Sequence, residues 1–126
     1  MKKIFVVYGH YDENSFNAAI RDTFIKSVEK NGHSVDLIDL YKEKFDPVFS
    51  GEEPDHQVLN HRKRIEGSDA IVIITEWQEF KYLEWEKISS LMRKPSWLFD
   101  LRSIADSKEA KSHGINVWKV GLGDLD

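Results

Sequence analysis

Two stretches of the chain are apolar almost without interruption: residues 4–7 (IFVV) and residues 70–75 (AIVIIT). Short runs of this kind, rich in β-branched side chains, are typical of strands that are buried on both faces, as in a parallel sheet. Weaker strand patterns follow at residues 34–40, 96–99 and 116–120. We therefore expect five strands, with residues 4–7 and 70–75 as neighbours at the centre of the sheet.

Helical patterns lie between these strands. Residues 15–31 repeat apolar side chains at the three-and-four spacing of a helix with one buried face. The expected buried stripe contains Phe16, Ala19, Ile20, Phe24 and Val28. Shorter helices are expected at residues 55–66, 83–93 and 106–112. Such alternation predicts an α/β three-layer sandwich, with helices on both faces of a five-stranded parallel sheet of order 2-1-3-4-5.

Composition narrows the functional classes. The chain has 126 residues, 40% hydrophobic and 32% charged, which predicts one domain over residues 1–126. A net charge of −4 argues against nucleic-acid and membrane-surface partners. There is no cysteine, and no apolar run has the length of about 18 residues that a membrane span requires. We expect a cytoplasmic protein.

The first candidate site lies where the first strand meets the first helix. Gly9 allows a turn, and Asn14 or Ser15 can then cap the helix with a side-chain oxygen. The first-turn N–H groups of a helix remain unpaired and carry a partial positive charge, so a phosphate can bind there. The sequence leaves two interpretations open: a purely structural cap or an anion site.

Several other chemistries are excluded by spacing. Neither a G-x-G-x-x-G fingerprint nor a P-loop is present. His56 and His61 are five residues apart and fall on different helix faces, so no metal site is expected. Catalytic residues cannot be assigned. Asp100 and Arg102 lie together at the carboxyl end of the fourth strand, either as a charge pair that caps the strand or as a ligand contact.

Residues 1–74 carry a first resemblance. After the first strand they read GHYDENSFNAAI, then GHSVDLIDLYKEKFDPVFS, then the buried DAIVII. This succession resembles the flavodoxin-like NAD(P)H quinone reductases. The resemblance implies a flavodoxin-like fold, FMN or FAD as cofactor, and a flavin phosphate held by His10, Ser15, Phe16 and Asn17. A small-molecule flavin or nucleotide would be the partner, and a homodimer is compatible with the sequence.

Residues 68–121 carry a second resemblance. They include TEWQEFKYLEWEKISSLMRKPSWLFDLRSI and the closing INVWKVGLG. These segments resemble the C-terminal UDP-binding domain of the UDP-glucose and GDP-mannose dehydrogenases. The resemblance implies that Arg102 lies near the substrate-binding region, although Leu101 stands where that family has Gly. The cofactor domain and catalytic cysteine of the family have no counterpart, so the complete reaction is not expected.

The two resemblances meet near residues 68–75, within a strand that both families possess. We interpret the chain as chimera-like, although recombination, construction and natural fusion would leave the same sequence. The main hypothesis is a flavodoxin-like domain that keeps a flavin or nucleotide phosphate loop without full quinone reductase catalysis. The alternatives are an α/β scaffold without activity and a UDP or nucleotide-sugar-binding domain.

Overall fold

The computed structural model describes residues 1–45, 56–121 and 123–124. These residues form a single sheet of order β2-β1-β3-β4-β5-β6, in which the first five strands named are parallel. The predicted order 2-1-3-4-5 is confirmed. The strands are β1 (Lys3–Tyr8), β2 (Ser34–Asp39), β3 (Ala70–Ile73), β4 (Ser96–Asp100), β5 (Ile115–Lys119) and β6 (Gly123–Asp124). The short β6 pairs antiparallel with β5 and was not predicted.

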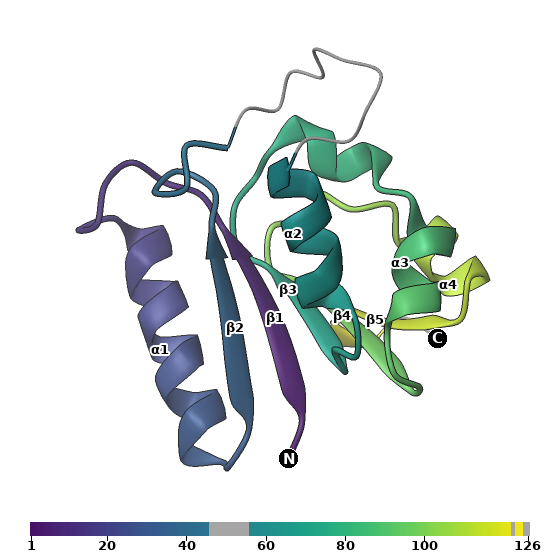
Figure 1. The fold of residues 1–126 in the computed structure, drawn as a ribbon. Helices are drawn as coiled ribbons and strands as arrows, with labels where there is room; N and C mark the ends of the chain where they lie inside the picture. The colour runs from purple at the N-terminus through teal and green to yellow at the C-terminus, as the bar shows by residue number, and fades with distance from the viewer. Residues whose placement is uncertain (46–55, 122, 125–126) are drawn as a thin grey trace.

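Helices cover both faces of this sheet (Figure 1). Helix α1 lies on one side, and α2, α3 and α4 lie on the other. Their bounds are α1 (Phe16–Lys30), α2 (His56–Ile65), α3 (Trp85–Leu91) and α4 (Ser107–Ser112), with a 3₁₀ helix, η1 (Gln78–Tyr82), before α3. The predicted start of the second helix at residue 55 lies outside the described residues.

The larger core lies between the sheet and helices α2 to α4. Because side chains alternate between the two faces of a strand, every second residue of the central strands enters this core, including Phe5, Ile71 and Ile73. Trp85 at the start of α3 is only 1% exposed and fills the space above them.

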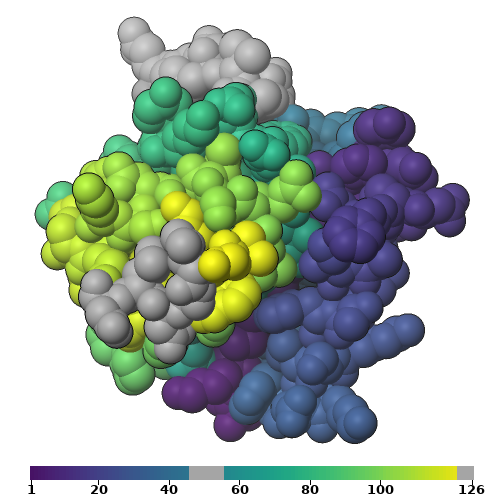
Figure 2. Space-filling view, turned by 180° about the vertical axis from the view of Figure 1, so that it is seen from behind, coloured from purple at the N-terminus to yellow at the C-terminus, as the bar shows by residue number. Residues whose placement is uncertain are grey.

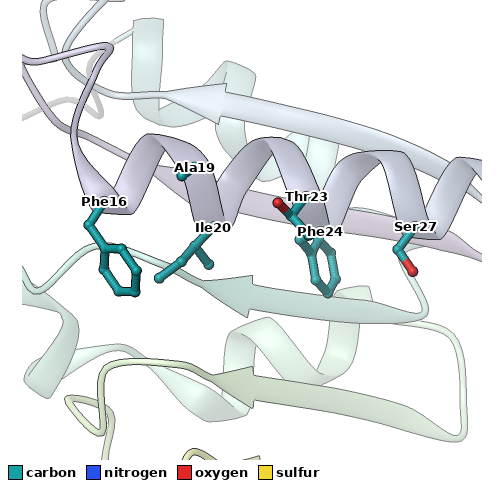
Figure 3. A pocket seen from close by; sticks show the side chains of 6 residues that line it. All are labelled: Phe16, Ala19, Ile20, Thr23, Phe24 and Ser27. Carbon is teal, nitrogen blue, oxygen red and sulfur yellow. The ribbon is translucent and has the colours of Figure 1, made fainter.

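The buried face of α1 agrees only in part with the predicted stripe: Ile20 and Phe24 pack against the core as expected. Ala18 and Arg21 are buried, whereas Phe16 is 79% exposed and Ala19 is also exposed. Phe16 and Ile20 project from one side of the helix, with Ala19 beside them (Figure 3). The buried face therefore also includes Arg21, whose guanidinium lies 4.6 Å from the ring centroid of the buried Tyr8.

The segment that follows β4 contacts the α1 side of the sheet. Leu101, after β4, packs against the same core as Ile20 and Phe24 of α1. In the view from behind, the indigo α1 region lies beside the green C-terminal half (Figure 2). The residues after β4 and the start of α1 thereby reach the same edge of the sheet.

Candidate functional site at the carboxyl edge

The first wall of the site is the junction between β1 and α1. The backbone N–H of Gly9 donates to Thr75 Oγ1 at 2.8 Å and so joins the end of β1 to the residue that follows β3. A Cβ on Gly9 would lie 3.2 Å from both Leu40 Cβ and the ring of Trp77. Glycine therefore allows close approach here, since a side chain would have to displace Leu40 or the Trp77 ring that covers the turn.

The loop that follows is ordered by its own side chains. His10 Nδ1 accepts a hydrogen bond from the backbone N–H of Asp12 at 3.0 Å, and Asp12 Oδ1 accepts one from the N–H of Asn14 at 2.9 Å. The His10 ring stacks on Tyr11, with their centroids 4.7 Å apart. His10 thus shapes the loop, and a direct role in ligand binding stays a prediction.

Of the two predicted caps, Ser15 is the one observed. Its Oγ accepts a hydrogen bond from the N–H of Ala18 at 3.1 Å, which satisfies one first-turn donor. Ala19 is the first residue whose N–H donates to a carbonyl of the helix, that of Ser15 at 3.1 Å, so helix geometry gives the N–H groups of Phe16 and Asn17 no intrahelical partner. They are the donors that an anion could use at this edge.

Arg102 reaches the same helix start from the other half of the chain. Its Nη1 donates to Asn17 Oδ1 at 3.2 Å, and its Nη2 lies 3.2 Å from Glu76 Oε2. The side chain is 33% exposed, so it borders both protein and solvent. A cation, a helix N-terminus and an exposed carboxylate therefore meet at one edge of the sheet.

Asp100 fixes the backbone that carries Arg102. Its carboxylate is fully buried and accepts hydrogen bonds from the N–H groups of Arg102 at 3.1 Å and Ala105 at 2.8 Å. The structural interpretation of Asp100 as a cap of the strand end is supported. Its partners are backbone donors, however, and not the Arg102 guanidinium that was expected.

The structure brings together some predicted site residues and separates others. Asn17 and Arg102 share a hydrogen bond, and Ser15 lies next to them as the cap. The Phe16 side chain projects into solvent from α1, so only its backbone faces the proposed anion position. Their binding roles stay predictions.

A buried cation beneath the loop was missed in the sequence. Arg21 is 7% exposed and donates to Asp22 at 2.9 Å and to Glu13 at 3.1 Å. The hydrogen bond to Asp22, helped by Glu13, raises the pKa of Arg21, although burial opposes this. The hydrogen bond from Arg21 lowers the pKa of Glu13, with Lys42 contributing. An arginine on a helix gives no sequence signal of such burial.

The basic cluster of α2 divides into two parts. Arg62 and Lys63 are exposed to solvent. Arg64 instead donates to Asp36 at 3.0 Å, and His61 lies 2.7 Å from Glu43. These two residues hold α2 against β2 and the segment after it.

Two classes of site have no support among the described residues. No group of three or more His, Asp or Glu side chains within residues 1–45, 56–121 and 123–124 could hold a metal ion. In the same part of the chain, no helix has the length and apolar character needed to cross a bilayer.

The strand order and the helices on both faces define the class of protein, a flavodoxin-like α/β domain. NAD(P)H:quinone oxidoreductase from Methanothermobacter marburgensis aligns with 96% of this chain and 88% of its own, at a TM-score of 0.58 and 13% identity. Smu.1420 from Streptococcus mutans aligns with 94% of this chain and 86% of its own, at a TM-score of 0.58 and 18% identity. At these identities the likeness concerns the fold alone.

Sequence comparison names the family. Residues 17–107 match the UDP-glucose/GDP-mannose dehydrogenase family, UDP binding domain. The chain therefore belongs to this family. The matched range begins in α1, within the part of the chain that also resembles the quinone reductases. The chimera-like origin stays a prediction.

Curated relatives agree with this family. UDP-glucose 6-dehydrogenase from Rickettsia typhi is 37% identical over an alignment of 92 residues that covers 66% of this chain and 20% of that protein. UDP-glucose 6-dehydrogenase 4 from Oryza sativa is 38% identical over 55 residues, which are 44% of this chain and 12% of that protein. The chain thus spans at most about a fifth of these relatives.

Proposed function

We propose that this chain is a nucleotide-binding domain that holds the diphosphate of a UDP-type ligand at the carboxyl edge of its sheet. One observation carries the proposal: Arg102 Nη1 lies 3.2 Å from Asn17 Oδ1, so a guanidinium stands beside the start of α1. The match to a UDP binding domain supports this choice over the flavin hypothesis. The proposal concerns binding and assigns no turnover.

The chemistry of the edge suits a diphosphate. One phosphate would accept hydrogen bonds from the N–H groups of Phe16 and Asn17 at the positive end of the helix. Arg102 would bind the other, because a guanidinium pairs with two phosphate oxygens at once. Glu76 would release Arg102 at small cost, since its side chain is 52% exposed and can be hydrated.

Calorimetric titration of UDP into the full chain tests the proposal. Arg102→Lys keeps the charge but loses the bidentate geometry, so affinity should fall about tenfold or more. Arg62→Lys is the matched control, because Arg62 is exposed on α2 and away from this edge. Equal affinity in the parent chain and in Arg102→Lys would refute the role of Arg102.

A flavin phosphate is the second candidate for the same helix start. The flavodoxin-like strand order favours it, because ligands of such sheets bind where the strand order reverses, outside the carboxyl ends of β1 and β3. FMN fluorescence should report weaker binding than UDP, and Ser15→Ala with Asn17→Ala should weaken it further. Equal FMN binding by the parent chain and by the double variant would place the flavin elsewhere. No binding of UDP or FMN would favour the scaffold hypothesis.

A further inference from the structure

A cavity lies on the other side of the sheet from α1. It has a volume of about 230 Å³ and is bounded by β1, β2, α2 and η1. Phe5 and Ile38 form its floor on the sheet, and Ile65 and Leu83 contribute walls from α2 and from the end of η1. Among residues 1–45 and 56–121, no lysine or arginine lines it, so this lining does not suit the diphosphate proposed above.

Aromatic rings form one side of this cavity. The ring centroids of Phe45 and Trp77 are 6.5 Å apart, and those of Trp77 and Phe80 are 6.1 Å apart with planes inclined by 15°. A planar ring could stack on or meet the edges of these side chains at similar spacing. Water gains few hydrogen bonds from such walls, and apolar protein cavities of about 150 Å³ are known to stay dry and bind benzene.

His61 gives the cavity one polar end. The ring of His61 lies 5.4 Å from that of Phe45, and both residues line the cavity. Its Nε2 is 2.7 Å from Glu43 Oε2, and Arg64 Nη1 donates to the other oxygen of Glu43 at 3.1 Å. A carboxylate only accepts hydrogen bonds, so Nε2 carries a proton, and Nδ1 is the ring nitrogen that remains for a ligand, as an acceptor in the Nε2–H tautomer.

We propose that this cavity is a binding site for a neutral, planar aromatic compound of one or two rings that carries a single O–H or N–H donor, of the size of phenol or indole. The ring occupies the space beside Phe45, Trp77 and Phe80, and the donor bonds to His61. Glu79, which also lines the cavity, disfavours anionic compounds through like-charge repulsion. The site is independent of the nucleotide proposal, which concerns the carboxyl edge.

Two probes test the proposal on the full chain: phenol, and toluene as a ring of the same size without a donor. Methyl resonances of Ile38, Ile65 and Leu83 should shift in ¹H–¹³C spectra and saturate for both compounds. Phenol should bind about fivefold more tightly than toluene, as expected for one hydrogen bond. His61→Phe should abolish this preference while toluene still binds.

Variants in which a larger side chain fills the cavity provide the decisive comparison with the parent chain. Leu83→Trp should abolish binding of both probes, and Ile65→Phe serves the same purpose if Leu83→Trp does not fold. Ile20→Phe on α1, at the opposite face of the sheet, should leave binding unchanged. Shifts that never saturate, or that persist in the folded filled variant, would overturn the proposal. Equal binding of phenol and toluene would overturn the role of His61.

Discussion

Asp100 is a carboxylate shielded from solvent, and its two oxygens accept hydrogen bonds from the backbone N–H groups of Arg102 and Ala105. Asp100→Ala leaves the buried N–H of Ala105 and the partly buried N–H of Arg102 without an acceptor, at about 1–3 kcal/mol each. We expect the free energy of unfolding in urea to fall by about 2–4 kcal/mol.

Asp12→Ala is the matched control for this change. Asp12 also accepts a backbone N–H, that of Asn14, but both groups are exposed. Water can replace the lost acceptor, so the expected loss is within about 0.5 kcal/mol. Equal losses in the two variants would show that burial at Asp100 contributes nothing.

Asp69 makes stability depend on pH at the opposite edge of the sheet. Burial raises its pKa, but hydrogen bonds from the Lys3 N–H at 2.7 Å and from Arg93 at 2.6 Å outweigh burial and hold the pKa below its usual range. A lowered folded-state pKa stabilises the protein above the unfolded value of about 3.9. This stabilisation is lost as the pH falls through the folded-state pKa.

The prediction is a difference between two pH profiles. Urea unfolding of the parent chain should lose stability steeply below about pH 4, and Asp69→Asn should show a shallower slope there. Asp69→Asn should also be less stable at neutral pH, because the pairing with Arg93 is gone. Parallel slopes would assign the acid sensitivity to other carboxylates.

At the scale of elements, two adjacent alanines test which face of α1 is buried. Ala18 is 1% exposed against the sheet, and Ala19 is exposed. Ala18→Leu forces extra methylene groups into a filled core and should destabilise the chain by about 1–3 kcal/mol. Ala19→Leu should change stability by less than about 0.5 kcal/mol. The reverse ranking in thermal unfolding would restore the stripe predicted from sequence.

The limits of α1 were predictable and its rotation was not. Ser15 and Gly32 mark its two ends, and the structure places a cap at Ser15 and a φ of +78° at Gly32. Both signals depend only on neighbouring residues, so they can be recognised in the sequence alone. The burial of Arg21 depends on Tyr8 and Glu13, which only the folded chain brings near. Periodicity alone assigns such an arginine to solvent.

For the candidate site, the shared edge was predictable from the sequence and the side-chain partners were not. The apolar runs of β1 and β3 required parallel strands, and parallel strands place the start of α1 and the residues after β4 at one edge. Asn17 and Arg102 are 85 residues apart and meet there. The partnership of Arg102 with Glu76 was not foreseen, because a side-chain choice among nearby carboxylates leaves no pattern in the sequence.

At the scale of the whole molecule, one sheet joins the parts that resemble two families, and β3 lies at its centre. That residues 1–126 form a single cooperative domain stays a prediction. Ile73→Asp places an unpaired charge in a dry core, where Ile73 is 1% exposed, and its cost of several kcal/mol is comparable to the stability of a small domain. We expect loss of the folded state by circular dichroism.

Val120→Asp is the control for Ile73→Asp, because Val120 is 46% exposed beyond β5. It should unfold in the same single transition as the parent chain. Retention of structure in one half of the Ile73→Asp chain would indicate two independently folded parts.

The central claim is that a nucleotide diphosphate binds where the start of α1 meets Arg102. The most direct measurement is a UDP titration of the ¹⁵N-labelled chain, followed through backbone amide shifts. We predict saturable shifts at the amides of Phe16, Asn17 and Arg102, with amides at the opposite edge, such as Asp69 and Arg93, unchanged. Saturation with shifts centred elsewhere, or no saturable shift with UDP, would contradict the account.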